Sequence, residues 1–228
     1  MKDPIYFRRF DYDRRLIPNE HLRTLELGVA DLDRAQERTG WTVGYPGWGL
    51  LYYVLLSHLS WDRANTIIET GTNWGASTIV LAQALVDAGV EGHVHTFELR
   101  PEFAMIARDN LDKAGLGKHV TIHVGNSLER LPRVLEDLRA VRVAFLDGSH
   151  EHDDVMMEFE TILTKLEPNG FVMFDNTYPL TDPSKGEPAR VAAALETIKA
   201  RHGGNIVNFE SVSWYTPGMA IWQPKFQA

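Results

Sequence analysis

The sequence predicts an α/β fold, with a single domain built on a mostly parallel sheet of seven strands. Short runs of β-branched and apolar residues alternate with amphipathic helical patterns from residue 66 onward. A glycine turn joins the first run to the first of these helices, and the last two runs flank residues 213–217 as a hairpin. Alternating strands and helices imply right-handed crossovers and parallel pairing, while the hairpin adds one antiparallel strand.

The elements follow from periodicity and from turn residues. In the helix expected over 101–114, apolar residues recur at Phe103, Ile106, Ala107 and Leu111, which is helical spacing. The predicted strands are residues 66–70, 93–98, 119–124, 141–147, 171–175, 205–212 and 218–223. The predicted helices are residues 19–37, 50–60, 76–88, 101–114, 127–138, 152–166 and 188–201.

Composition narrows the classes of function. The chain has 228 residues, with 23 basic against 31 acidic side chains, a net charge of −8. This balance argues against a nucleic-acid or anionic-membrane partner. The chain has no cysteine, which excludes disulfides, thiolate nucleophiles and cysteine metal sites. No apolar run has the length of a signal peptide core or a membrane span, so we expect a cytoplasmic enzyme.

The glycine turn carries the first functional signal. Glu69, Gly71 and Gly75 form a Glu-x-Gly-x-x-x-Gly pattern, in which Gly71 permits a tight turn and Gly75 a close approach to a ligand. A dinucleotide fingerprint would have its middle glycine where Asn73 stands, and the P-loop sequence Gly-Lys-Ser/Thr is absent. The turn therefore favours an adenosyl cofactor without phosphates, against the alternative of a plain strand-to-helix turn.

Polar residues at the other strand ends extend this site. Glu98 ends the second strand, 27 residues after Gly71, where a carboxylate can accept both ribose hydroxyls. Because Pro101 follows closely, Glu98 can instead be a solvated helix cap. Asp147, Asp175 and Asn176 end two neighbouring strands, and three oxygen donors suit Mg²⁺. Taken alone, Asp147 is also typical of a strand-to-loop turn, and the Asp175-Asn176 pair is also typical of an Asx-type cap.

His150 is the candidate catalytic residue. It stands three residues after Asp147, and an imidazole accepts a proton near neutral pH. A metal ligand and a purely structural histidine are the alternatives.

The glycine pattern resembles motif I of the class I S-adenosylmethionine-dependent methyltransferases. The spacing of Asp147 from Asp175 and Asn176 is similar to that of the metal-dependent, catechol-type O-methyltransferases, and Asp147-Gly-Ser-His150 looks more like a bacterial branch with sugar and antibiotic O-methyltransferases. The resemblance covers about residues 42–223. It implies a Rossmann-like methyltransferase domain with N-terminal helices, and it places His150 where related animal enzymes have a lysine that removes the substrate proton.

The resemblance also implies a set of binding residues. Asn126 and Ser127 would line the adenine pocket, although Ser127 can also be a helix N-cap. The residues expected to bind S-adenosylmethionine are Glu69, Gly71, Thr72, Asn73, Gly75, Ser77, Glu98, Asn126, Ser127 and Asp147. The residues expected to bind a divalent cation, Mg²⁺ first, are Asp147, Asp175 and Asn176.

The expected domains are an N-terminal helical extension and lid over 1–60 and the cofactor-binding domain over 61–228. The loops Gly44–Gly49 and Tyr178–Pro188 are expected to close over the acceptor, with Trp48 and Tyr178 in the substrate pocket. The expected acceptor is a small hydroxylated molecule, such as a sugar, a phenol or a natural-product intermediate. A metal-free methyltransferase, a hydroxylase-like relative and a non-catalytic member of the fold are the alternatives, and the oligomeric state, a homo-oligomer included, stays open.

Overall fold

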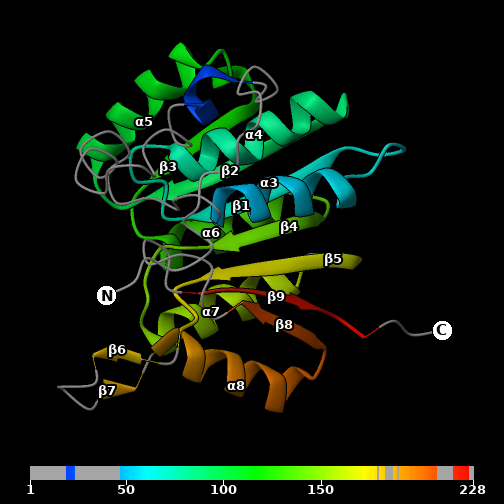
Figure 1. Ribbon diagram of the computed structural model, residues 1–228, viewed down its shortest axis with the longest axis vertical. Helices are drawn as coiled ribbons and strands as arrows, with labels where there is room; N and C mark the ends of the chain where they lie inside the picture. Colours follow the sequence, from blue (N-terminus) through cyan, green and yellow to red (C-terminus); the bar gives the residue numbers. More distant parts are fainter. Residues whose placement is uncertain are drawn as a thin grey trace, which may run out of the picture.

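Seven strands form one twisted sheet in the order β3-β2-β1-β4-β5-β9-β8 (Figure 1). The computed structural model describes residues 19–23, 47–178, 180–182, 187–188, 190–209 and 218–225. The strands of this sheet are β1 (Asn65–Thr70), β2 (Gly92–Glu98), β3 (Val120–Val124), β4 (Val141–Leu146), β5 (Leu166–Asp175), β8 (Asn205–Phe209) and β9 (Met219–Gln223). β1 to β5 pair in parallel, and β9 runs antiparallel to both β5 and β8. The predicted sheet, including its antiparallel C-terminal strand, is confirmed.

Helices cover both faces of the sheet. The helices are α3 (Gly47–His58), α4 (Ala76–Ala88), α5 (Pro101–Lys113), α6 (Ser127–Asp137), α7 (His152–Leu163) and α8 (Arg190–His202), with the short 3-10 helix η3 at Gly117–His119. Apolar side chains of α3, α4 and α5 form one core, and those of α6, α7 and α8 form the other. In Figure 1, α3 and α4 lie in front of the sheet and α7 lies behind it.

The pleat of the strands divides the apolar residues between these two cores. Ile67 faces the α4 side and Ile68 the α7 side, and both are fully buried. All six residues of β4 are buried, as expected for a central parallel strand covered by helices on both faces. The order of strands reverses between β1 and β4, so the carboxyl ends of these two strands mark the topological switch point, where ligands bind in such sheets.

Several details of the elements differ from the prediction, among them the end of α7 at Leu163 rather than at residue 166. β5 begins at Leu166 rather than at residue 171, and an irregularity in its pairing with β4 accommodates Pro168 and Gly170. α3 begins at Gly47, inside the expected loop Gly44–Gly49. Gly47, Trp48 and Gly49 are all buried there. The expected loop Tyr178–Pro188 contains a short antiparallel pair, β6 (Leu180–Asp182) and β7 (Glu187–Pro188).

The described part of the N-terminal region packs on the α4 face. Leu22 lies fully buried in the same core as α3 and α4, and the Asn19 side-chain amide donates to the Gln83 side chain at 2.9 Å. Residues 20–23 are helical, and the remainder of the helix predicted over 19–37 lies outside the described residues. So do residues 210–212 of the strand predicted over 205–212, and the hairpin residues 213–217.

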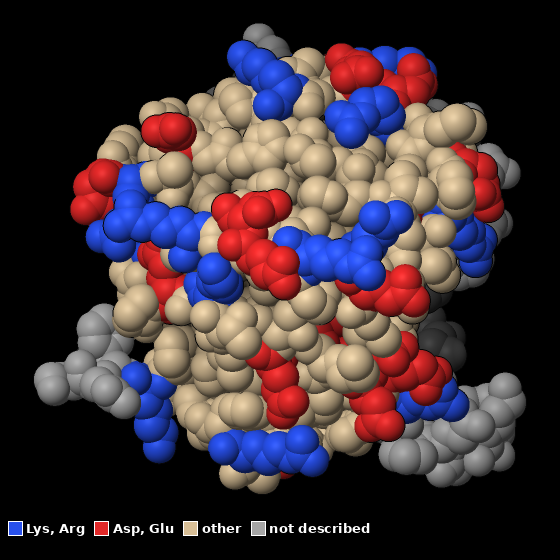
Figure 2. Space-filling view, turned by 180° about the vertical axis from the view of Figure 1, so that it is seen from behind, with Lys and Arg blue, Asp and Glu red and all other residues tan. Residues whose placement is uncertain are grey.

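The surface shows no large area of one charge on the face in Figure 2, where Lys and Arg are interspersed with Asp and Glu. None of the helices in the described ranges has the length and apolar character needed to cross a membrane.

Candidate active site

A cavity of about 560 Å³ opens at the carboxyl ends of β1, β2, β3 and β4. This volume lies within the usual range of small-molecule sites. Eight of the residues predicted to bind cofactor or to act in catalysis line it: Gly71, Asn73, Ser77, Glu98, Asn126, Ser127, Asp147 and His150. The structure therefore gathers residues from four separate strand ends around one space, as the parallel topology requires.

The turn after β1 is shaped by Gly71. Its φ is +86°, and a Cβ atom there would lie 2.1 Å from the backbone oxygen of Asp147. Glycine is therefore required both by the backbone conformation and by the close approach of the turn after β4. Gly75 has a φ of +87°, but its missing side chain leaves room for Ala107 of α5, 3.2 Å from the position of a Cβ. Gly75 is not among the residues that line the cavity, and its contact with the cofactor stays a prediction.

Glu98 is held at the rim of the cavity by two backbone donors. The Asn73 N–H donates to one of its carboxylate oxygens at 2.7 Å, and the Arg100 N–H donates to the other at 2.9 Å. A carboxylate has about four acceptor positions, so Glu98 keeps free lone pairs facing the cavity. The two predicted roles are compatible, because the same carboxylate that joins the β1 turn to the start of α5 can accept ribose hydroxyls.

Glu69 and Thr72 lie beneath the turn rather than in the cavity. Glu69 is fully buried and accepts a hydrogen bond from the Thr78 hydroxyl. Burial raises the pKa of Glu69 to about 7, against hydrogen bonds from Ser77, Thr78 and Thr96 that lower it. The Thr72 hydroxyl is 2.6 Å from the hydroxyl of Thr96. Both residues therefore support the turn from below, and the structure does not bring them to the predicted ligand.

In the turn after β3, the residue that caps α6 is not Ser127, which the sequence offered as the N-cap. Asn126, not Ser127, is the N-cap of α6, and its side-chain oxygen accepts from the Leu128 N–H at 2.9 Å. The Ser127 hydroxyl instead donates to Glu158 at 2.6 Å. Both residues line the cavity, so the cap leaves them available beside a ligand.

Glu158 is a buried acid that the sequence reasoning missed. It accepts hydrogen bonds from Ser127 and, at 2.9 Å, from the Thr70 hydroxyl, so it joins α7 to the ends of β1 and β3. Burial raises its pKa to about 7. The signal was present in the sequence, because Glu158 lies at helical spacing between the apolar residues Val155 and Ile162 of α7, on the face turned to the sheet.

Asp147, His150 and Asp175 form the acidic part of the site. Each offers a ligand atom, and these atoms lie within 4.8 Å of one another. Burial raises the pKa of Asp147 to about 8, and burial together with the neighbouring Asp147 raises the pKa of Asp175 well above its usual value. Burial and the neighbouring negative charge therefore disfavour ionisation of both carboxyl groups at once, and a bound cation would relieve that repulsion.

His150 bridges this acidic pair and Asn176. Its Nε2 lies 3.3 Å from Oδ1 of Asp147, and its Nδ1 lies 2.9 Å from the side-chain amide of Asn176. Asn176 adopts the left-handed region with a φ of +56°, which turns it toward His150 as β5 ends. Burial lowers the pKa of His150, while the nearby Asp175 raises it. The imidazole is 45% exposed and therefore reachable from the cavity.

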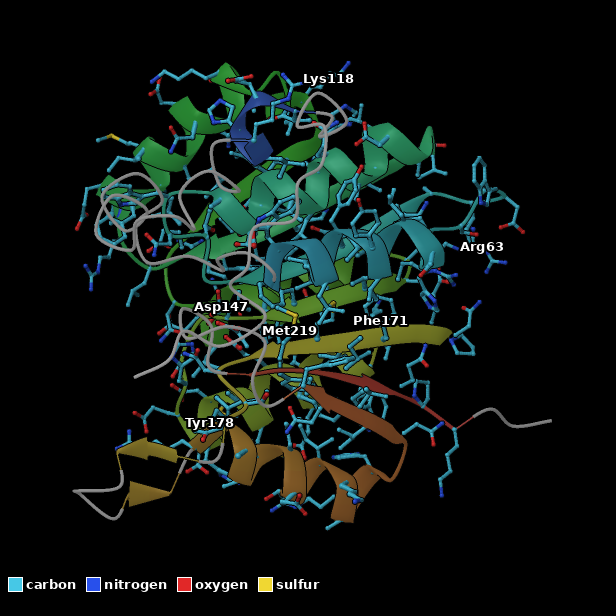
Figure 3. All side chains as sticks on the ribbon, viewed as in Figure 1. Arg63, Lys118, Asp147, Phe171, Tyr178 and Met219 are labelled. Atoms are coloured by element: carbon cyan, nitrogen blue, oxygen red, sulfur yellow. The ribbon has the colours of Figure 1, made fainter. Side chains whose placement is uncertain are left out.

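The two residues predicted for the substrate pocket, Trp48 and Tyr178, differ in where they lie. Trp48 is buried in the core formed by α3, α4 and α5, because α3 begins one residue before it. Tyr178 is half-buried and follows β5; in Figure 3 it lies on the same side of the molecule as Asp147. Neither is among the residues that line the cavity described above.

Residues adjacent to the predicted ones complete the lining. Arg100 lies over the ring of Phe103, with its guanidinium carbon 4.6 Å from the ring centroid, and both line the cavity. The Ser149 hydroxyl donates to Asp154 at 2.6 Å, and these two also line it. Each follows a predicted strand end by only a few positions, so proximity in sequence to the strand end was the available signal.

Comparison with known proteins agrees with this geometry. Residues 68–177 match the family model described as a methyltransferase domain. A catechol O-methyltransferase of Niastella koreensis is 30% identical over 131 residues, 56% of this chain and 57% of that protein. Its counterpart from Mycobacterium tuberculosis is 33% identical over 103 residues, 45% of this chain and 44% of that protein. The chain thus spans about half the length of the curated relatives it matches.

Solved structures support the fold over a longer stretch. An O-methyltransferase from Bacillus cereus, in complex with S-adenosylhomocysteine, has a TM-score of 0.71 at 23% identity, covering 92% of this chain and 93% of its own. An O-methyltransferase from Streptomyces achromogenes involved in tomaymycin synthesis has a TM-score of 0.70 at 24% identity and covers 91% of both chains. The resemblance to class I S-adenosylmethionine-dependent methyltransferases is confirmed by the match of residues 68–177 to the methyltransferase-domain model, and the solved structures share the fold.

Proposed function

We propose that this protein, built on a class I methyltransferase domain, transfers the methyl group of S-adenosylmethionine to a hydroxyl of a small molecule. The catechol O-methyltransferases that it resembles carry out that class of reaction, as their names state. The observation that carries the proposal is the set Asp147, His150 and Asp175, a potential cation site and a proton acceptor beside the cavity at the switch point.

The chain's part in cofactor binding is to hold an adenosyl group between fixed strand ends. Glu98 offers acceptor positions for the ribose hydroxyls, while Asn126 and Ser127 lie where the adenine would stand. Gly71, which has no side chain, and Asn73 line the same cavity. S-adenosylmethionine supplies the methyl group, activated on a sulfonium sulfur.

A divalent cation fits the acidic part of the site. Oδ1 of Asp175 is buried and has no hydrogen-bonding partner among the described residues. Burial raises the pKa of both Asp147 and Asp175, and neighbouring acids raise each pKa further, an effect that a cation would offset. Asp147, Asp175 and the side-chain oxygen of Asn176 would hold the ion, with Mg²⁺ favoured by oxygen donors. A bound cation would lower the pKa of the acceptor's hydroxyl.

His150 would take the proton of the acceptor. Its lowered pKa keeps the ring neutral at pH 7, so one ring nitrogen carries a lone pair that can accept a proton. The hydroxyl oxygen would form its new bond to the methyl carbon as the carbon–sulfur bond breaks, and the hydroxyl proton would pass to His150. Asn176 and Asp147, within 3.3 Å of the ring, would orient it. Most of the acceleration would come from holding two reactants at reacting distance.

Metal dependence and turnover of S-adenosylmethionine distinguish the proposed function from its alternatives. A metal-free methyltransferase would work in chelator, a hydroxylase-like relative would consume no S-adenosylmethionine, and a non-catalytic member would bind the cofactor without turnover. The expected acceptor remains a sugar, phenol or natural-product intermediate. The lid over 1–60, the closing loops, the cytoplasmic location and the lack of a nucleic-acid or membrane partner remain predictions.

The test is a methyl-transfer assay with S-adenosylmethionine and a panel of sugars, catechols and other phenols, read by mass spectrometry. We expect a product heavier by one methylene unit, loss of turnover in chelator and its recovery with Mg²⁺. S-adenosylhomocysteine should bind in calorimetry and NAD should not. Tighter binding of NAD than of S-adenosylhomocysteine would refute the cofactor assignment, and full activity in excess chelator would refute the metal.

A further inference from the structure

Four of the nine histidines gather at the β2–β3 edge of the sheet, away from the strand-end site. His93 and His95 alternate along β2, so their side chains share one face. His123 lies on β3, and the parallel register pairs it with Phe97 and pairs His95 with Thr121. His119 ends η3, just before β3. Among the described residues, no role in the proposed methyl transfer involves these four.

The rings of His95 and His123 are close enough to share one ion. Nδ1 of His95 lies 3.1 Å from Nε2 of His123, and the two rings stack with centroids 5.4 Å apart. Two nitrogens each at about 2.0–2.1 Å from a tetrahedral Zn²⁺ would lie roughly 3.3 Å apart, so only a small ring shift separates this contact from shared coordination.

Neighbouring rings hold this pair in place. Phe97 stacks on His123, with ring centroids 4.9 Å apart, and is itself almost fully buried. The His93 ring lies 5.0 Å from that of His95, and its Nε2 is 2.8 Å from the Thr121 hydroxyl. His93, His95 and His123 are each partly exposed. The His93 ring thus borders the pair, but the three rings do not bring one nitrogen each within 4.8 Å of one another; solvent reaches the pair itself.

The protonation state suits a metal ligand. Burial, with the adjacent His93 and His123, lowers the pKa of His95 to about 4, and burial also lowers the pKa of His93 and of His123. Neutral imidazoles keep the lone pairs that bind metals.

Charged groups around the patch come from two elements. On α6, Arg130, Arg133 and Asp137 line a cavity of about 450 Å³ together with His123. Lys118 of η3 stands beside His119. The positive charges of Arg130 and Arg133 disfavour protonation of the histidine rings and also disfavour a bound cation. The site should therefore prefer ions that bind imidazole strongly over ions held by charge alone.

We propose that His95 and His123 bind a divalent transition-metal ion such as Zn²⁺ or Ni²⁺ at the β2–β3 edge. Water would fill the remaining positions. Imidazole nitrogens select Zn²⁺, Ni²⁺ and Cu²⁺, whereas the oxygen donors at the strand ends suit Mg²⁺. The two sites therefore differ in the class of ion that they take, and the histidine site does not depend on the proposed methyl transfer.

The test is calorimetry of the full chain with Zn²⁺ and with Ni²⁺, and with Mg²⁺ as the comparison ion. His95→Gln and His123→Gln should each weaken the histidine-site affinity for both transition metals at least tenfold. His202→Gln, on α8 and paired with Glu160, is the matched histidine control and should keep that affinity. Asp175→Asn should keep it too, because it alters only the strand-end site.

Unchanged Zn²⁺ and Ni²⁺ binding in His95→Gln and His123→Gln would overturn the proposal, as would loss of all binding in Asp175→Asn. A second measurement uses the unaltered protein and does not depend on folded variants. Substoichiometric Ni²⁺ should broaden the ring NMR signals of His95 and His123 first, in a sample held at saturating Mg²⁺. Broadening confined to His150 would assign the ion to the strand-end site and refute the histidine site.

Discussion

The two ends of the sheet bury carboxylates in opposite ways. At the amino-terminal end of β4 and β5, the Arg142 guanidinium donates to Glu167 at 2.9 Å and to the backbone oxygen of His58 at 2.7 Å. At the carboxyl end, Asp147 and Asp175 lie beside each other, and no salt bridge among the described residues pairs either of them with Lys or Arg; the imidazole of His150 lies 3.3 Å from Asp147. Figure 3 shows Arg63, which precedes β1, and Asp147 at opposite ends.

This difference separates a structural end from a functional one. The Arg142–Glu167 pair is balanced, so its two buried charges compensate each other within the protein. The carboxyl end holds several acids with raised pKa values and no balancing Lys or Arg pair among the described residues. Perturbed carboxyl groups around a cavity are typical of sites that await a ligand, here a cation and a substrate.

The largest expected effect is on catalysis at the carboxyl end. His150→Ala should keep both cofactor and metal yet lower the rate roughly 10²–10⁴-fold, the usual scale for losing a general base. His152→Ala is the matched control, because His152 contacts Thr197 and Asp153 instead of the acidic pair. Metal loss in His150→Ala would reassign the histidine as a ligand, and an unchanged rate would make it structural.

At the opposite end, the expected effect is on stability alone. Arg142→Ala should lower the free energy of unfolding by about 3–5 kcal/mol, because the buried Glu167 would lose its near partner and keep the more distant guanidinium of Arg63, 4.0 Å away. Chemical denaturation followed by circular dichroism measures this change. The double variant Arg142→Met with Glu167→Leu should recover most of the loss. An Arg142→Ala variant as stable as the original protein would show that the ion pair does not contribute to stability.

Cofactor affinity tests the rim of the cavity. Glu98→Ala should weaken S-adenosylhomocysteine binding by about 1–3 kcal/mol, the scale for hydrogen bonds to a charged group. Glu98→Gln keeps one acceptor oxygen for the Asn73 or Arg100 N–H, so it should lose less. Equal affinity in the original protein and in Glu98→Ala, measured by calorimetry, would place the ribose elsewhere.

The pH dependence of stability gives the smallest of these effects. The pKa of Glu158 is raised from 4.5 to about 7, so between these values the unfolded chain ionises first and the folded form loses stability as pH rises. Glu158→Gln should make the free energy of unfolding less dependent on pH between these values. At pH 8 it should raise that free energy by on the order of 1 kcal/mol, minus the cost of weakening the hydrogen bonds that Thr70 and Ser127 donate to Glu158. Glu167→Gln, the matched control, should destabilise instead. An identical slope in Glu158→Gln would contradict the burial argument.

Much of the fold was predictable because its signals are local. The Gly71 turn, the alternation of helices and strands and the C-terminal hairpin each depend on a few adjacent residues. Asp147 and Asp175 could be brought together by topology, because parallel strands end at the same edge.

The errors arose where packing between distant segments decides the outcome. Trp48 stands in a glycine-rich stretch that looks like a loop, yet burial against α4 makes it helical. Glu158 becomes a site residue only because α7 turns it toward Thr70 and Ser127. Periodicity places such residues on a face but does not say what that face meets.

The most direct test of the account is Mg²⁺ binding measured by calorimetry on the original protein and on Asp175→Asn, with Glu167→Gln as a buried carboxylate at the other end of the sheet. The account predicts one Mg²⁺ site in the original protein and in Glu167→Gln, and its loss in Asp175→Asn with S-adenosylhomocysteine affinity unchanged. Undiminished Mg²⁺ binding by Asp175→Asn, or its loss in Glu167→Gln alone, would contradict the claim that the unbalanced carboxyl end is the functional one.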